Sequence, residues 1–136
     1  MRNGSNPVLA MINCHCGSHQ TFEDCCEPVI SGQKIAQTAE QLMRSRYSAF
    51  VEQNQQWLLD SWHPQTRPSR VSFDSNQRWI GLSIKNTLDG QAHQSTGQVE
   101  FVARFKINGK AVRLRENSYF ERVNGLWLYR RGDHLD

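Results

Sequence analysis

All four cysteines of this 136-residue chain lie in one short stretch, Cys14-His15-Cys16-Gly17-Ser18-His19-Gln20-Thr21-Phe22-Glu23-Asp24-Cys25-Cys26. Thiols two positions apart on an extended segment point to the same side, and Gly17-Ser18 allows the chain to turn back toward the second pair. Four thiolates that converge in this way suit a tetrahedral Zn²⁺ site with Zn–S bonds of about 2.3 Å and no open position for water. The sequence therefore predicts a structural zinc knuckle with the ligands Cys14, Cys16, Cys25 and Cys26, in which the metal supplies folding energy that so short a segment cannot gain by burial.

Two other uses of these cysteines are open. Four cysteines allow three pairings into two disulfides, and a thiol redox role is a third reading, although the C-x-x-C spacing typical of it is absent. Residues 1–13 hold one basic residue and only a short apolar run, so we expect no secretory signal and a cytoplasmic location, where disulfides are disfavoured. His15 and His19 could each replace a cysteine as ligand and rank below the four thiols.

The charge of the chain is unevenly distributed. The formal net charge is +3, but residues 1–28 carry Arg2 against Glu23, Asp24 and Glu27, a net −2. Four thiolates around Zn²⁺ would add a further −2, so the knuckle is predicted to be an acidic head on a basic body. A chain of this length suits one ordinary core, and no apolar run is long enough to predict a membrane span.

The pattern after the knuckle predicts helices first and strands later. Thr38, with Gln41 three residues on, indicates the start of a helix whose apolar stripe includes Leu42, Met43 and Phe50. A second short helix is predicted from Gln55 to Trp62, ended by Pro64. From Trp79 the hydrophobic period changes to two, and two Asn-Gly pairs, at 108–109 and 124–125, are typical of tight hairpins. The predicted fold class is α+β, with two or three helices packed on a curved four-stranded antiparallel sheet.

Two charged residues fall among apolar ones. Arg46 lies near the middle of the apolar stripe of the first helix, and Glu116 lies in phase with apolar residues of the third strand. A buried charge needs a partner, so we predict a buried Arg46–Glu116 ion pair. The pair either fixes the register of helix on sheet or lines a small ligand pocket. The residues predicted for such a pocket are Arg46, Tyr47, Trp62, His63, Glu116 and Trp127.

The cysteine spacing resembles the SEC-C zinc motif, and further segments resemble the YchJ-like family of bacterial proteins. The matching residues are Ser31-Gly32, Leu42-Met43-Arg44-Ser45-Arg46-Tyr47-Ser48-Ala49-Phe50, Trp62-His63-Pro64, Trp79-Ile80-Gly81-Leu82, Val99 to Phe105, Glu116 to Phe120 and Asn124-Gly125-Leu126-Trp127. The resemblance implies a SEC-C-type zinc knuckle over residues 1–30, followed over residues 31–136 by a nuclear transport factor 2-like (cystatin-like) cone domain. Domains of that kind often dimerise through the sheet, so a homodimer is also implied.

The resemblance implies a non-enzymatic protein-interaction module whose knuckle docks on a protein partner. SEC-C knuckles that dock on the SecB chaperone or on ribosomal RNA are often lysine-rich, whereas residues 17–24 contain no Lys or Arg, so the acidic knuckle argues against these partners. One alternative is small-molecule binding, or acid/base catalysis with His63, in the pocket around Arg46 and Glu116. Another is RNA or ribosome association through a basic sheet face that contains Arg113, Arg115, Arg122, Arg130 and Arg131. Catalytic triads, metal-hydrolase motifs and phosphate-binding glycine loops are absent from the sequence, so an enzyme is the less favoured class.

Overall fold

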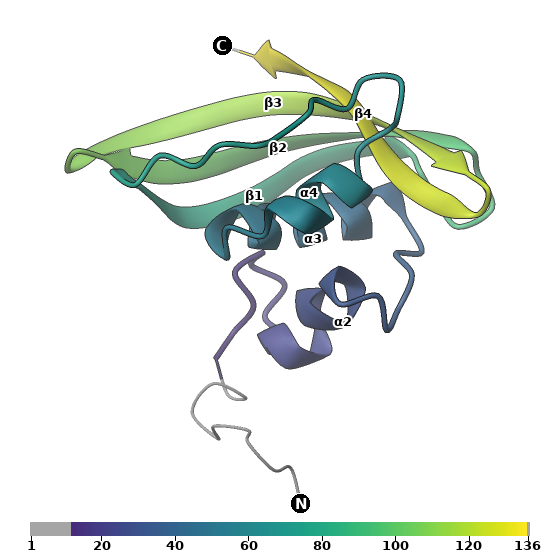
Figure 1. The fold of residues 1–136 in the computed structure, drawn as a ribbon, viewed down its shortest axis with the longest axis horizontal. Helices are drawn as coiled ribbons and strands as arrows, with labels where there is room; N and C mark the ends of the chain where they lie inside the picture. The colour runs from purple at the N-terminus through teal and green to yellow at the C-terminus, as the bar shows by residue number, and fades with distance from the viewer. Residues whose placement is uncertain (1–11, 136) are drawn as a thin grey trace, which may run out of the picture.

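The computed structural model describes residues 12–135, and it has two layers (Figure 1). A four-stranded sheet forms one layer, and the helices cover one of its faces, with the cysteine-bearing segment farthest from the sheet. The elements are η1 (Phe22–Asp24), α2 (Cys26–Ile30), α3 (Ala39–Val51), α4 (Gln55–Asp60), β1 (Gln77–Asp89), β2 (Thr96–Ile107), β3 (Lys110–Val123) and β4 (Leu126–Leu135). The predicted α+β class is confirmed. Residues 1–11 of the predicted knuckle and residue 136 lie outside the described residues.

The sheet is the predicted antiparallel meander, in the order β1-β2-β3-β4. Asn108 and Gly109 have φ values of 50° and 79°, and Asn124 and Gly125 have 51° and 81°. Positive φ at both central residues gives a two-residue hairpin turn whose twist matches that of the strands, which is why Asn-Gly is favoured there. Register shifts interrupt β1 twice and the β3–β4 pairing once, and such bulges increase the curvature of a sheet around the helices it covers.

Helix α3 begins where the sequence predicts. The Thr38 side chain accepts a hydrogen bond from the Gln41 amide at 3.0 Å, and the Gln41 side chain in turn accepts from the Gln37 amide at 2.6 Å. This is the reciprocal capping pattern, with the return bond one residue earlier than in the usual capping box. The buried face of α3 includes Leu42, Met43, Arg46, Tyr47 and Ala49, so Arg46 does lie among apolar residues.

Helix α4 is shorter than predicted, because residues 61–63 leave the helix to pair with β4. The Tyr129 amide donates to the Ser61 carbonyl at 2.8 Å, and the His63 amide donates to the Tyr129 carbonyl at 2.7 Å. A parallel bridge joins Trp62 to Tyr129. The prediction that the helix continues to Trp62 is therefore wrong, and this segment instead extends the sheet beyond β4.

The core is continuous from the cysteine-bearing segment to the sheet. Cys14, Cys16, Cys26 and Val29 belong to the same buried cluster as α3 residues such as Leu42 and as Phe101, Phe120 and Trp127 of the sheet. The described part of the knuckle is therefore packed on α3, which lies between it and the sheet (Figure 1).

Candidate metal centre and concave cavity

The knuckle is shaped by a short hairpin followed by two short helices. The Cys14 amide donates to the Gln20 carbonyl at 2.7 Å, and Gly17, with a φ of 79°, makes the turn between the two arms. Thr21 then caps η1 through the Asp24 amide, and α2 begins at Cys26. The turn and the helix start carry the two cysteine pairs back toward each other.

The four sulfur atoms have the spacing of a tetrahedral metal site. All four Sγ atoms lie within 4.8 Å of one another; the Cys16–Cys25 distance is 3.6 Å and the Cys25–Cys26 distance is 3.9 Å. Ligands of a tetrahedron with metal–sulfur bonds of about 2.3 Å are about 3.8 Å apart, whereas disulfide sulfurs are about 2.05 Å apart. All four cysteines are free. The disulfide alternative is therefore wrong, and the residues present fit a metal ion.

The thiols are enclosed by protein on the side that faces α3. Cys14, Cys16 and Cys26 are buried and Cys25 is half-buried. Ser48 Oγ lies 3.6 Å from Cys14 Sγ, Ser18 Oγ lies 3.1 Å from Cys25 Sγ, and the Arg44 guanidinium donates to the Cys16 carbonyl at 2.7 Å. Four ligands with little open surface suit a closed, structural site rather than a catalytic one.

Contacts within the cluster shift the pKa values of the thiols in opposite directions. Hydrogen bonds from the Cys14 and Cys26 thiols lower the pKa of Cys16, and hydrogen bonds to Cys14 and Cys16 raise the pKa of Cys26. Burial raises the pKa of Cys25 to about 11. The four thiols therefore lie close enough to perturb one another strongly. A bound divalent cation would take the place of the thiol protons and hold all four sulfurs as thiolates.

The two histidines of the knuckle are not part of the sulfur cluster. The cluster that could hold a metal contains only cysteines among residues 12–135. His15 Nε2 lies 2.6 Å from Oε2 of Glu52, the residue that caps the C-terminal end of α3, and the His15 ring packs against Phe22. His15 therefore connects the knuckle to α3, and His19 is exposed.

A second feature is a cavity of about 190 Å³ between α3 and the concave face of the sheet. Four of the predicted pocket residues line this cavity: Arg46, Tyr47, Trp62 and Glu116. Ser118 and Tyr129 also line it, and neither was among the predicted residues. Ser118 lies two residues after Glu116 on β3 and shares its face, so strand alternation was a signal that could have found it.

The predicted direct ion pair between Arg46 and Glu116 is wrong. In the part of the chain that the structure describes, Arg46 forms no ion pair, and Nη1 donates to the Leu58 carbonyl at 2.8 Å and to Ser61 Oγ at 2.7 Å. The guanidinium carbon lies 4.4 Å from the ring centroid of Tyr129 and 5.0 Å from that of Trp62. Burial lowers the pKa of Arg46 to about 10, although the charges of Tyr129 and Glu116 oppose that change.

His63 and Trp127 lie away from this cavity. His63 Nε2 is 2.9 Å from Glu121 Oε2, and Arg130 Nη1 lies 3.3 Å from the same oxygen. Trp127 is buried, and its Nε1 donates to the Gln37 carbonyl at 3.2 Å. His63 therefore contacts Glu121 of β3, and Trp127 contacts the segment before α3. The structure does not bring either residue to Arg46.

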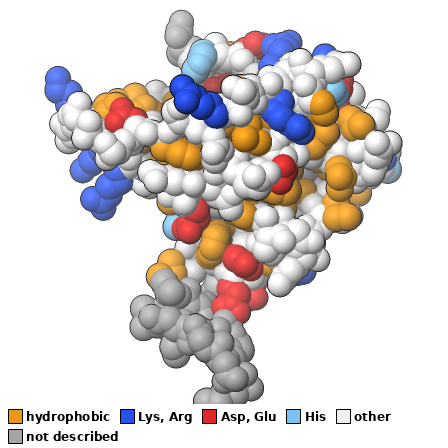
Figure 2. Space-filling model, in the orientation of Figure 1, with side chains coloured by type: hydrophobic (Ala, Val, Ile, Leu, Met, Phe, Trp, Pro, Cys, Tyr) orange, Lys and Arg blue, Asp and Glu red, His pale blue; other side chains and the backbone are white. Residues whose placement is uncertain are grey.

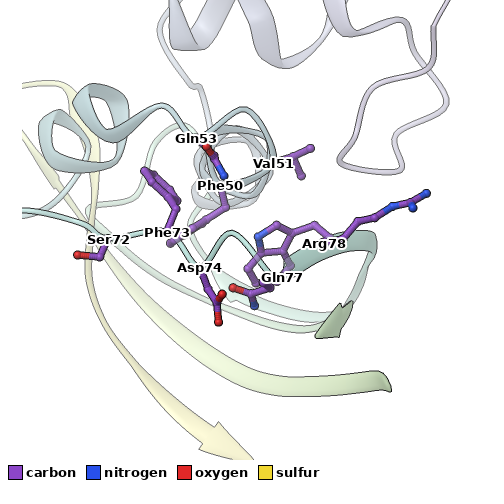
Figure 3. A pocket seen from close by; sticks show the side chains of 9 residues that line it. Phe50, Val51, Gln53, Ser72, Phe73, Asp74, Gln77 and Arg78 are labelled. Atoms are coloured by element: carbon purple, nitrogen blue, oxygen red, sulfur yellow. The ribbon is translucent and has the colours of Figure 1, made fainter. Parts of the chain in front are cut away.

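A further cavity, of about 330 Å³, lies beside the first. Its lining side chains come from the end of α3, from residues 72–74 and from the start of β1 (Figure 3). Phe50 and Trp79 line both cavities, with ring centroids 5.8 Å apart. These two rings therefore separate the cavities.

Comparison with known proteins identifies the family. The family model for the middle NTF2-like domain of YchJ matches residues 38–132. The chain belongs to the YchJ family. Two similar bacterial relatives are UPF0225 proteins. The one from Streptomyces coelicolor is 46% identical over 123 residues, 90% of this chain and 96% of the relative. The one from Corynebacterium glutamicum is 44% identical over 120 residues, 88% of this chain and 95% of the relative.

Solved structures confirm the fold and the cysteine motif expected for a YchJ-family chain. The solution structure of a SEC-C motif containing protein from Rhodopseudomonas palustris is similar, with a TM-score of 0.80 and 30% identity, over 92% of this chain and 100% of that one. The crystal structure of a SEC-C motif containing protein from Psychrobacter arcticus matches with a TM-score of 0.74 and 24% identity, over 91% and 83%, and this likeness concerns the fold alone. No helix within residues 12–135 is long and apolar enough to cross a bilayer.

Proposed function

We propose that this protein is a non-enzymatic zinc protein that acts by binding a basic partner protein through its knuckle. The observation that carries the proposal is the closed cluster of four sulfurs, all within 4.8 Å of one another and packed on α3. Such a site leaves no position for a substrate. The metal would therefore fix a surface in place, and the surface would do the binding.

Zinc is the metal that the donor set favours. Four thiolates in a tetrahedron suit Zn²⁺ or an iron–sulfur centre, whereas oxygen ligands, which suit Mg²⁺ and Ca²⁺, are absent from the described cluster. The SEC-C likeness supports the same choice. Elemental analysis of the purified protein is expected to give one zinc per chain. Iron, or less than half an equivalent of any metal, would contradict this assignment.

The outward surface of the knuckle carries negative charge. Asp24 is exposed, and Glu23 and Glu27 are half-buried on the same segment. In Figure 2, acidic side chains gather on the knuckle, whereas most Lys and Arg side chains lie over the sheet. Because Zn²⁺ with four thiolates adds two negative charges, complementarity favours a basic partner.

The test compares two sets of three neutralised acids. One variant carries Glu23→Gln, Asp24→Asn and Glu27→Gln. The control carries Asp89→Asn, Glu100→Gln and Asp133→Asn, which changes the net charge equally at the sheet. A partner is captured from bacterial lysate with the wild type and purified, and its affinity for each variant is measured at two salt concentrations. The knuckle variant is expected to bind at least about tenfold more weakly, with less salt dependence. Equal losses in the two variants would refute the assigned surface.

A second candidate function is association with RNA through the sheet. Two pairs of like charges lie directly opposite each other across strands, Arg78 with Lys106 and Arg104 with Arg113. Like charges in such positions destabilise a sheet, so a polyanion that neutralises them would offset that cost. RNA affinity that falls steeply with salt, and less steeply after Lys106→Gln and Arg113→Gln, would support this candidate.

A further inference from the structure

The cavity under the sheet contains a buried cation that contacts no carboxylate. Arg46 is only 3% exposed, and it forms no ion pair within the described part of the chain. Only Nη1 is occupied there, by the Leu58 carbonyl and Ser61 Oγ, and the remaining guanidinium nitrogens donate to no residue among 12–135. A guanidinium has five N–H donors, so part of this group lines the cavity with unused donors.

Burying a charge without an anionic partner is costly. Stacking against Tyr129 and Trp62, at 4.4 Å and 5.0 Å from the ring centroids, compensates part of that cost. The lowered pKa of Arg46 has the same origin, since burial outweighs the charges around it. A small anion that enters the cavity would supply the missing charge.

Trp62 provides a second, independent sign of a ligand. Its Nε1 is fully buried and has no hydrogen-bond partner in the part of the chain that the structure describes. Trp62 lines the same cavity as Arg46, and its ring stacks on the Arg46 guanidinium. Buried polar groups rarely lack a partner, and a donor of this kind is commonly satisfied by a ligand or a water molecule. The two residues with unmet donors, Arg46 and Trp62, therefore line one cavity.

An acceptor lies on the β3 side of the cavity. Glu116 Oε1 accepts from Ser118 Oγ at 3.2 Å, and Oε2 lies 3.9 Å from Nδ1 of the exposed His134. Gly132 makes room for this carboxylate, because a Cβ at that position would lie 2.0 Å from Glu116 Oε1. Between the cation and this acceptor the lining is mostly aromatic and aliphatic, with Tyr47, Trp79 and Phe101 among its residues.

We propose that this cavity binds a small aromatic carboxylate that bears a hydrogen-bond donor on its ring. The carboxylate would accept from Arg46 and Trp62, the ring would pack against Tyr47, Trp79 and Phe101, and the donor would face Glu116. The size agrees, because an apolar cavity of about 150 Å³ holds benzene and this one has about 190 Å³. The site takes small-molecule ligands and is separate from the partner surface of the knuckle.

The test uses 4-hydroxybenzoate and benzoate as probes, with benzyl alcohol as a neutral analogue of similar size. Binding to the zinc-loaded full chain is followed by calorimetry and by the fluorescence of the tryptophans that line the cavity. The carboxylates are expected to bind at least about tenfold more tightly than benzyl alcohol. The hydroxyl of 4-hydroxybenzoate is expected to add affinity that Glu116→Gln removes.

Two variants separate binding from folding. Arg46→Gln removes the cation. Trp62→Phe removes the indole N–H, which forms no described hydrogen bond, together with part of the ring that packs on Arg46 and Tyr129. An aromatic ring remains at this position, so Trp62→Phe should fold while binding benzoate several-fold more weakly. Trp57→Phe is the matched control, because Trp57 Nε1 donates to Ser45 Oγ and Trp57 does not line this cavity. The control should lower stability and leave benzoate affinity unchanged. Any of three results would overturn the proposal. The first is equal affinity for benzoate and benzyl alcohol, and the second is no binding of either carboxylate at millimolar concentration. The third is equal benzoate affinity in wild type and Trp62→Phe.

Discussion

The close contact between the β1–β2 connection and the start of α3 can be tested with a single methyl group. A Cβ on Gly97 would lie 2.4 Å from Gly90 Cα, 2.8 Å from Gly90 N and 3.2 Å from Ala39 Cβ. Carbon atoms in ordinary contact are about 3.5–4.0 Å apart. Gly97→Ala therefore requires the two backbone segments to separate by about 1 Å or more, and neither side is a flexible side chain that can turn away.

The expected cost follows from what moves. Overpacking costs about 1–3 kcal/mol. The Gly90 carbonyl also accepts from the Ala39 amide at 2.9 Å, and the Gly90 amide donates to the Thr96 carbonyl at 3.0 Å. Loss of good geometry in these two bonds adds about 0.5–1.5 kcal/mol each. We expect Gly97→Ala to lower the free energy of unfolding by about 2–6 kcal/mol.

Gly81→Ala is the matched control. Gly81 lies in β1 with no left-handed φ, and a Cβ there would meet nothing within 4 Å. This change should be neutral or stabilise by up to about 1 kcal/mol, because alanine restricts the unfolded chain. Urea unfolding of the zinc-loaded variants, followed by tryptophan fluorescence, gives both values. Free energies of unfolding for Gly97→Ala and Gly81→Ala that differ by less than about 0.5 kcal/mol would refute the described packing of α3 on the sheet.

Three further outcomes are expected. Cys14→Ser should lower bound zinc well below one equivalent and destabilise the fold, measured by elemental analysis and urea unfolding, and retention of full zinc would contradict a four-sulfur site. Leu58→Ala, at a side chain that is 0% exposed, should cost about 2–5 kcal/mol of unfolding free energy, and a cost below about 1 kcal/mol would contradict its burial. Burial raises the pKa of Tyr129 to about 12. The folded state therefore keeps the Tyr129 proton above the ordinary pKa near 10, and the stability that this protonated hydroxyl contributes is lost as pH rises from 10 to 12. Tyr129→Phe should make the decline of unfolding free energy over this pH range shallower. An unchanged decline would contradict the raised pKa.

The elements that were predicted correctly depend on local chemistry. Strand alternation and the two Asn-Gly turns determine the order and pairing of β2, β3 and β4, because a hairpin fixes its own register. The start of α3 depends on Thr38, whose side chain satisfies an amide three residues away. The cysteine spacing implies convergence of the sulfurs for the same reason, since the turn at Gly17 joins the two pairs directly.

The arrangement around Arg46 could not be predicted, because it depends on the end of another helix. The helical period places Arg46 on the buried face of α3 but does not say which element covers it. The last turn of a helix leaves carbonyls without partners, and Arg46 donates to the Leu58 carbonyl in the last turn of α4. A cation on an apolar stripe can therefore satisfy its donors at a helix end as well as at an acid, and the sequence contains no signal that separates the two.

His63 was grouped with Trp62 because the two residues are adjacent in sequence. Residues 61–63 pair with β4, and side chains of an extended segment alternate between its two sides. Trp62 therefore lies beside Tyr129 at the cavity, while His63 contacts Glu121 and Arg130. The sequence predicted a helix through residue 62, and a helix at this point would not place Trp62 and His63 on opposite sides.

Helix α3 connects the two sites, because neighbouring residues on it face opposite ways. Arg44 and Ser48 contact the knuckle through the Cys16 carbonyl and Cys14 Sγ, whereas Arg46 and Tyr47 line the cavity. The metal would hold the knuckle on one side of this helix, and the ligand would occupy the other. If the metal and the ligand favour the same position of α3, each would raise the affinity for the other by the same factor, because coupling between two binding sites is reciprocal. The knuckle would then position α3 in addition to offering the proposed partner surface.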